Sequence, residues 1–145
     1  MATTSQSFAN HTRWHPPFHF FVLPVMLINF FWAVVLFVKT PGRNSGWWIV
    51  VSLALLLLTF FVRTNALKVQ DRIIRLEERL RYQQLLAPVV VQQTSALTPQ
   101  QMVALRFASD GELEQLVTAI AAGKISKPKE IKQAITSWRA DTFRV

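Results

Sequence analysis

The sequence predicts an all-α membrane protein: a two-helix transmembrane hairpin, a second helix that extends into the cytoplasm, and a small C-terminal helical tail. Two apolar runs, residues 18–38 and 47–62, flank a short loop that contains Pro41 and Gly42. A helix rises about 1.5 Å per residue and the hydrocarbon core is about 30 Å thick, so the first run spans it and the second spans it with its flanking residues. We therefore divide the chain into an N-terminal interfacial arm, the hairpin, a cytoplasmic helix extension and a C-terminal three-helix tail, at residues 1–17, 18–63, 64–87 and 88–145.

Prolines mark the beginning of the first helix. Pro16 and Pro17 stand where the missing amide hydrogens cost least, at the first turn. Pro24 follows about one turn later and removes a backbone hydrogen bond, so we expect a bend there. The polar residues before Pro16 show no periodicity and predict an arm that lies along the membrane surface.

The second helix is expected to continue beyond the membrane without a break to about Leu86. Residues 63–86 contain no glycine or proline, and most of them favour helix. Apolar residues recur there at spacings of three and four, which is typical of a helix-packing or coiled-coil surface. The members of this stripe are Ala66, Val69, Ile73, Leu76 and Leu80, followed by Gln83. We call the first five the apolar seam and predict that they contact a partner.

Pro88 is expected to end the long helix, and the tail then contains three helix-start signals. Residues 87–94 read as a connector in which residues 89–91 form a short extended piece. Capping-box patterns begin at Thr98 and Ser109, a third start lies at residues 126–128, and Gly123 ends the second helix. The apolar faces of these helices are Met102, Val103, Leu105 and Phe107; Leu113, Leu116, Val117 and Ile120; and Ile131, Ile135 and Trp138.

Charge predicts the orientation of the hairpin. The chain carries 16 Lys+Arg against 8 Asp+Glu, and much of the basic excess follows the second apolar run. Cytoplasmic flanks of membrane helices are enriched in Lys and Arg, so we expect both termini in the cytoplasm. This explanation of the basic charge is favoured over binding of nucleic acid, which we do not expect.

Five basic residues beside the second apolar run form a candidate site for anionic lipid. Four of them are expected on a helix face roughly 100° from the apolar seam. A basic side chain close to an anionic membrane surface contributes about 1 kcal/mol of binding, whereas the simpler interpretation is a solvated face that sets topology. The residues are Arg63, Lys68, Arg72, Arg75 and Arg79, and we call them the basic stripe.

Histidines and an intramembrane amide are the remaining candidates. His11, His15 and His19 are four residues apart, and imidazole can bind haem iron or chlorophyll magnesium. The two prolines interrupt the spacing, so an interfacial anchor is the favoured interpretation, with His19 the best ligand candidate.

Asn29 stands near the middle of the first run, and an unpaired amide is costly in hydrocarbon. It is expected to contact Ser52 or Thr59 of the second helix, or a neighbouring subunit, in helix–helix packing.

Four segments also resemble a known family. They are NHTRWHPPFHFFVLP at residues 10–24, RTNALKVQDRIIRLEERLR at 63–81, LTPQQMVALRFASDGEL at 97–113 and IKQAITSWRADTFRV at 131–145. The chain is similar to a family of small bacterial two-span membrane proteins of uncharacterised function. The resemblance implies a bacterial membrane protein with a hairpin and a tail. It implies no activity and no functional residue.

The sequence favours an interaction protein over an enzyme. It has no cysteine, which excludes disulfides, thiolate catalysis and cysteine-ligated metal, and it contains no phosphate loop, zinc motif or nucleophile elbow. We therefore expect no enzymatic activity and no cofactor, and an accessory or scaffold subunit of a larger membrane complex, for example a respiratory or photosynthetic one. The alternatives are a homo-oligomer that pairs through the seam and a pigment- or haem-binding subunit that uses His19.

Overall fold

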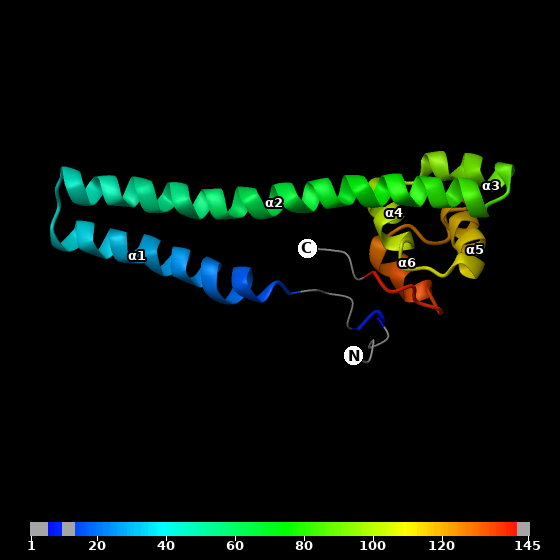
Figure 1. Ribbon diagram of the computed structural model, residues 1–145, viewed down its shortest axis with the longest axis horizontal. Coiled ribbons are helices and arrows are strands. Elements are labelled where there is room, and N and C mark those ends of the chain that lie inside the picture. The colour runs from blue at the N-terminus through cyan, green and yellow to red at the C-terminus, as the bar shows by residue number, and fades with distance from the viewer. Residues whose placement is uncertain (1–5, 10–13, 142–145) are drawn as a thin grey trace. The chain divides into compact units, whose positions relative to one another are not determined.

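The structure, a computed structural model, describes residues 6–9 and 14–141 (Figure 1). It divides into two compact units, which we call the hairpin unit and the C-terminal unit. Among the described residues, the hairpin unit comprises residues 14–68, and the C-terminal unit comprises residues 6–9 and 69–141. Helices dominate the described residues, where no β-strand occurs and the one isolated bridge joins Ala108 to Trp138. The predicted all-α fold is confirmed.

Two long apolar helices make up the hairpin. A π-helical segment, η1 (Pro17–Val22), leads into α1 (Leu23–Lys39), and α2 (Arg43–Leu85) comes after a short loop. Figure 1 shows α1 running antiparallel beside the first part of α2. Both Pro17–Lys39 and Arg43–Leu85 are long and apolar enough to cross a membrane, and 6% of the most apolar window of each is buried. A core helix of a soluble protein would be mostly buried, so these helices present apolar surface to their surroundings.

Pro24 has a local consequence for the first helix. Its ring nitrogen cannot donate to the carbonyl four residues earlier, and the ring crowds that carbonyl. The chain accommodates this with the wider π-helical turns of η1, which end at Val22, just before Leu23 and Pro24 open α1. The proline therefore changes the type of helix at this point.

Helix α2 continues without interruption from Arg43 to Leu85. This agrees with the absence of helix-breaking residues between Arg63 and Leu86. It joins an apolar first half to a charged second half, and the second half provides the surface on which the C-terminal unit packs.

The C-terminal unit contains four short α-helices and one short 3₁₀ turn beside the last turns of α2 (Figure 1). They are α3 (Pro88–Gln93), η2 (Thr94–Ala96), α4 (Pro99–Leu105), α5 (Asp110–Ala121) and α6 (Pro128–Ala134). Their apolar faces enclose one core, to which α2 adds Tyr82 and the residue that follows α2 adds the Leu86 side chain. Phe107, Leu113 and Ile131 are fully buried at its centre. The short helices thus obtain a core from one another and from α2, as small elements must.

The start of α4 and the end of α5 have the capping residues that the sequence predicts. Thr98 accepts a hydrogen bond from the Gln101 amide, and the Gln101 side chain accepts one from the Thr98 amide, so the capping box at α4 is complete. Gly123 has a φ of 71°, the left-handed conformation that ends α5. Local sequence chemistry was sufficient at both positions.

Three details of the predicted tail are wrong. Residues 89–91 lie in α3, where the amides of Val90 and Val91 bond to the Ala87 carbonyl and Val90 enters the core, so packing overrides β propensity. The Ser109 side chain does not cap α5; its hydroxyl donates to Glu112 instead. Trp138 does not belong to α6, because that helix ends at Ala134.

The N-terminal arm is described at residues 6–9 and from residue 14. Gln6 accepts a hydrogen bond from the Asp141 amide through its side-chain oxygen, at 2.8 Å. This part of the arm therefore contacts the end of the C-terminal unit, and its place along a membrane surface stays a prediction. His11 lies outside the described residues, so the three-histidine pattern has no structural counterpart here.

Candidate functional site

The apolar seam lies exposed on the charged half of α2. Val69, Ile73, Leu76 and Leu80 keep 56%, 52%, 61% and 52% of their surface accessible, and Ala66 is exposed as well. Large apolar side chains at regular helical spacing are normally covered in the interior or by a partner. The C-terminal unit leaves the seam uncovered. Packing in the chain's own core therefore does not explain why apolar residues recur there at helical spacing.

A different face of α2 packs on the C-terminal unit. Ile74, Glu78, Tyr82 and Leu86, each four residues after the last, are all buried. At 100° per residue this face is centred about 180° away from the seam. The long helix therefore carries two stripes on nearly opposite sides. The C-terminal unit covers one of them and leaves the seam exposed.

Sequence reasoning missed this second stripe. Its signal was present as an apolar pattern at Ile74, Tyr82 and Leu86, but the buried charges Glu78 and Arg81 interrupt it. Charged residues are rarely buried without partners, so a pattern search reads them as solvent-exposed. They pair with each other, but their further partners, Asp110 and Arg139, lie far away in sequence and could not be read from the helix alone.

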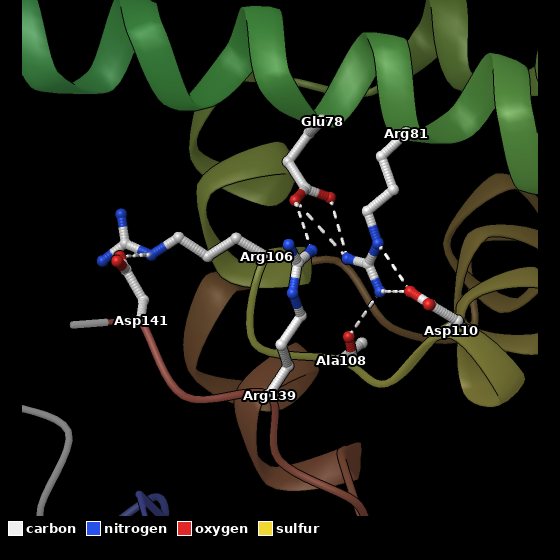
Figure 2. Close-up of polar contacts among 7 residues, drawn as sticks. All are labelled: Glu78, Arg81, Arg106, Ala108, Asp110, Arg139 and Asp141. Carbon is white, nitrogen blue, oxygen red and sulfur yellow. Dashed lines mark hydrogen bonds and ion pairs between the residues drawn. The ribbon is translucent and has the colours of Figure 1, made fainter. Parts of the chain in front are cut away.

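Arg81 connects α2 to the beginning of α5 (Figure 2). Its Nε and Nη2 donate to Asp110 Oδ1 at 2.9 and 2.6 Å, and Nη2 also donates to the Ala108 carbonyl at 2.7 Å. Its Nη1 reaches Glu78 at 3.2 Å. Arg81 forms no ion pair with Glu77, four residues earlier on the same helix, because Asp110 offers a charged partner at the start of a packed helix. The buried Arg81 side chain therefore joins α2 to the start of α5.

Glu78 is the most buried carboxylate of this cluster. Its side chain is 4% exposed and contacts Arg81 and the Arg139 guanidinium, whose Nη1 lies 3.8 Å from Oε1. Burial raises the pKa of Glu78 above its ordinary value, although Arg81 and Arg139 oppose that shift. A second pair, Arg106 with Asp141 at 3.2 Å, joins α4 to the chain after α6 (Figure 2).

These residues line a cleft of about 710 Å³ within the C-terminal unit. Its charged walls contain four carboxylates and three arginines. Arg81 pairs with two of these carboxylates, and Arg106 and Arg139 pair with one each. This arrangement fits a cluster of ion pairs that stabilises the unit, since buried charges are stable only when they are paired.

The basic stripe lies between the two faces of α2. Lys68, Arg72 and Arg79 are exposed, whereas Arg63 and Arg75 are partly covered. The Arg63 guanidinium lies 5.7 Å from the centre of the Phe18 ring. Among the described residues, none of the five forms an ion pair. Their charges therefore remain available to anions, and contact with anionic lipid stays a prediction.

Inside the hairpin, the polar candidates form no hydrogen bond with one another. Ser52 donates to the carbonyls of Trp48 and Ile49, and Thr59 donates to that of Leu55, all within α2. Asn29 is exposed, and the structure gives it no hydrogen bond to either hydroxyl. The expected bond within the hairpin is not formed, because each hydroxyl is satisfied by its own helix. A neighbouring subunit remains the predicted partner of the Asn29 amide.

His19 lies at the beginning of the first helix, partly covered. Its Nδ1 lies 3.0 Å from the His15 carbonyl and 3.2 Å from the His15 amide, and its ring packs on Trp14 and Phe18. These contacts suit an aromatic anchor at a helix end. Within residues 6–9 and 14–141 no three potential metal-ligating groups of His, Asp or Glu gather. A pigment or haem contact is therefore still only an expectation.

Comparison with known proteins identifies the family of the chain. The family of unknown function DUF6526 matches residues 1–145. The chain belongs to this family. The match covers the hairpin and the C-terminal unit together, so both units are parts of one family unit. No curated protein and no solved structure matches the chain.

Proposed function

We propose that this protein is a non-enzymatic accessory or scaffold subunit of a larger bacterial membrane complex. The hairpin anchors it in the cytoplasmic membrane with both termini in the cytoplasm. The apolar seam binds a partner, and the basic stripe contacts anionic lipid beside it. The observation that carries the proposal is the exposed seam, on a face of α2 distinct from the one that packs its own C-terminal unit.

Two features of the structure support this role. The hairpin helices bury little of their surface and present aromatic and aliphatic side chains outward, which fits lipid and neighbouring helices. The cleft of the C-terminal unit is lined by arginines that pair with carboxylates. Such pairing fits a cluster that stabilises the unit better than it fits a catalytic site.

Seam recognition is tested with Ile73→Asp in the full-length chain. A carboxylate buried against an apolar partner costs several kcal/mol, and each 1.4 kcal/mol is about tenfold in affinity. We expect recovery of co-purifying subunits from native membranes to fall at least about tenfold, measured by quantitative mass spectrometry.

The matched control is Val89→Asp. Val89 is 69% exposed on α3, away from the seam, so it introduces the same charge at a branched aliphatic residue outside the proposed interface. Its recovery should equal that of the unmodified chain. Equal recovery with both variants would show that the seam does not hold the protein in the complex and would overturn the proposal.

A further inference from the structure

We infer that the seam is covered by a second copy of this chain, with the two α2 helices parallel. The inference rests on the proposed function, because it names the partner of the same surface. Two copies that insert into one membrane with the same topology point their α2 helices in the same direction. Any pairing between their charged halves is then parallel, as in a parallel coiled coil.

The spacing of the seam fits such a coiled coil. In the heptad notation a to g, Ala66, Ile73 and Leu80 occupy a positions, and Val69, Leu76 and Gln83 occupy d positions. The face that packs on the C-terminal unit, Ile74, Glu78 and Tyr82, then falls at b, f and c. These positions point away from a coiled-coil partner. A second helix can thus cover the seam while α2 keeps its contacts with its own unit.

Charge decides the direction of the pair. The positions beside the seam carry Arg72 and Arg79 at g and Glu77 and Gln84 at e. In a parallel pair, each g residue faces the e residue five positions later in the partner helix. Arg72 then meets Glu77 of the second copy, twice by symmetry, and Arg79 meets Gln84. An antiparallel pair would bring g to g and place arginine against arginine.

The two charged residues are available for this contact. Neither Arg72 nor Glu77 takes part in an ion pair with another residue of the described chain. Both are exposed on α2. The charge complementarity is therefore built into the helix and unused within one copy.

Single-cysteine cross-linking tests the pair, because the chain has no cysteine of its own. Ile73→Cys and Leu76→Cys, one at an a and one at a d position, should form disulfide-linked dimers in isolated membranes after addition of an oxidant. Residues at a and d face their own counterparts across a parallel pair, within the short Cβ separation that a disulfide requires. The control is Asp71→Cys, which is exposed at an f position and should remain monomeric.

Charge exchange tests the direction. In the Leu76→Cys background, Glu77→Arg should lower the cross-linking yield several-fold, since it sets arginine against arginine in both symmetric contacts. The double exchange Arg72→Glu with Glu77→Arg should restore the yield, because it recreates the opposite-charge pair. Failure of the double exchange to restore it, or equal cross-linking at Asp71→Cys, would overturn the parallel register.

The outcomes separate this inference from the proposed function. If no seam cysteine cross-links while Ile73→Asp still reduces the recovery of other subunits, the seam is an interface for a foreign chain. The second-copy inference is then wrong, and the proposed function stands. If Ile73→Asp also has no effect, both are wrong.

Discussion

At the scale of single residues, Arg81 shows how a charge can hold a small unit together. Its side chain is 9% exposed, and its guanidinium binds the carboxylates of Glu78 and Asp110 and the backbone carbonyl of Ala108. Burial of an ion pair is costly, and a hydrophobic pair of equal volume can be as stable. Removal of one partner is a different matter, because the other charge stays buried without compensation.

Arg81→Met should therefore destabilise the C-terminal unit by on the order of 3 kcal/mol, the cost of breaking a buried pair. The variant keeps the aliphatic stem but leaves Glu78 with Arg139 alone. Hydrogen exchange of α4, α5 and α6 in the detergent-solubilised full chain measures the loss. Arg79→Met, exposed two residues earlier, is the matched control, with an expected effect within about 0.5 kcal/mol. Similar protection in both variants would contradict the structural role of Arg81.

At the scale of elements, Glu112 determines the path of the chain after α6. Its carboxylate accepts hydrogen bonds from the Thr136 amide, the Thr136 hydroxyl and the Ser137 amide. These amides are no longer free to continue the helix, so the chain becomes extended at Ile135 and Trp138 packs on Phe107, 5.1 Å between ring centres. One carboxylate on α5 thus ends α6 and directs the segment that contains Arg139 and Asp141.

This contact makes the C-terminal unit sensitive to acid. Although partial burial opposes ionisation, the hydrogen bonds from Thr136 and Ser137 hold the pKa of Glu112 below its ordinary value. Because the folded-state pKa is the lower one, Glu112 adds stability that is complete above its unfolded pKa of about 4.3. That stability is lost as pH falls through the folded-state pKa.

We expect Glu112→Gln to lower the thermal midpoint of the C-terminal unit at pH 7, and the difference from the unmodified chain to shrink as pH falls below about 4.3. Trp138 fluorescence reports the transition in a full-length background where the other four tryptophans are phenylalanine. Glu114→Gln, exposed on the same helix, should show no such difference. A midpoint difference that stays constant from pH 7 to pH 3 would argue against the assigned role of Glu112.

At the scale of the whole molecule, an even number of spanning helices places both chain ends on one side of a membrane. The hydrogen bond between Gln6 and Asp141 agrees with this, since it joins residues from the two ends within one unit. The basic residues that come after the apolar part of α2 favour the cytoplasm for that side.

Cysteine labelling in intact cells checks this orientation. Asn44→Cys, exposed in the first turn of α2, should react with a membrane-impermeant reagent, whereas Gln115→Cys on α5 should react only after permeabilisation. The absence of native cysteine makes each signal specific. The reverse pattern would place the C-terminal unit outside the cytoplasm and contradict the positive-inside interpretation.

The sequence alone determined those features that depend on neighbouring residues. The two apolar helices result from run length, the unbroken α2 from the absence of glycine and proline, and the start of α4 and the end of α5 from Thr98 and Gly123. Each is set by propensity, periodicity or capping within a few residues, which a linear reading captures.

Tertiary structure decided which face of α2 the C-terminal unit covers, what Arg81 and Glu112 bind, and where α6 ends. Arg81 and Asp110 are 29 residues apart, and Glu112 and Thr136 are 24 apart. Locally, Glu77 was as good a partner for Arg81 as any, and Ser109 was as good a cap as Thr98. Such near-equal local alternatives are separated only when packing brings distant groups together and removes water from them, because a buried charge or amide must then take the partner within its reach.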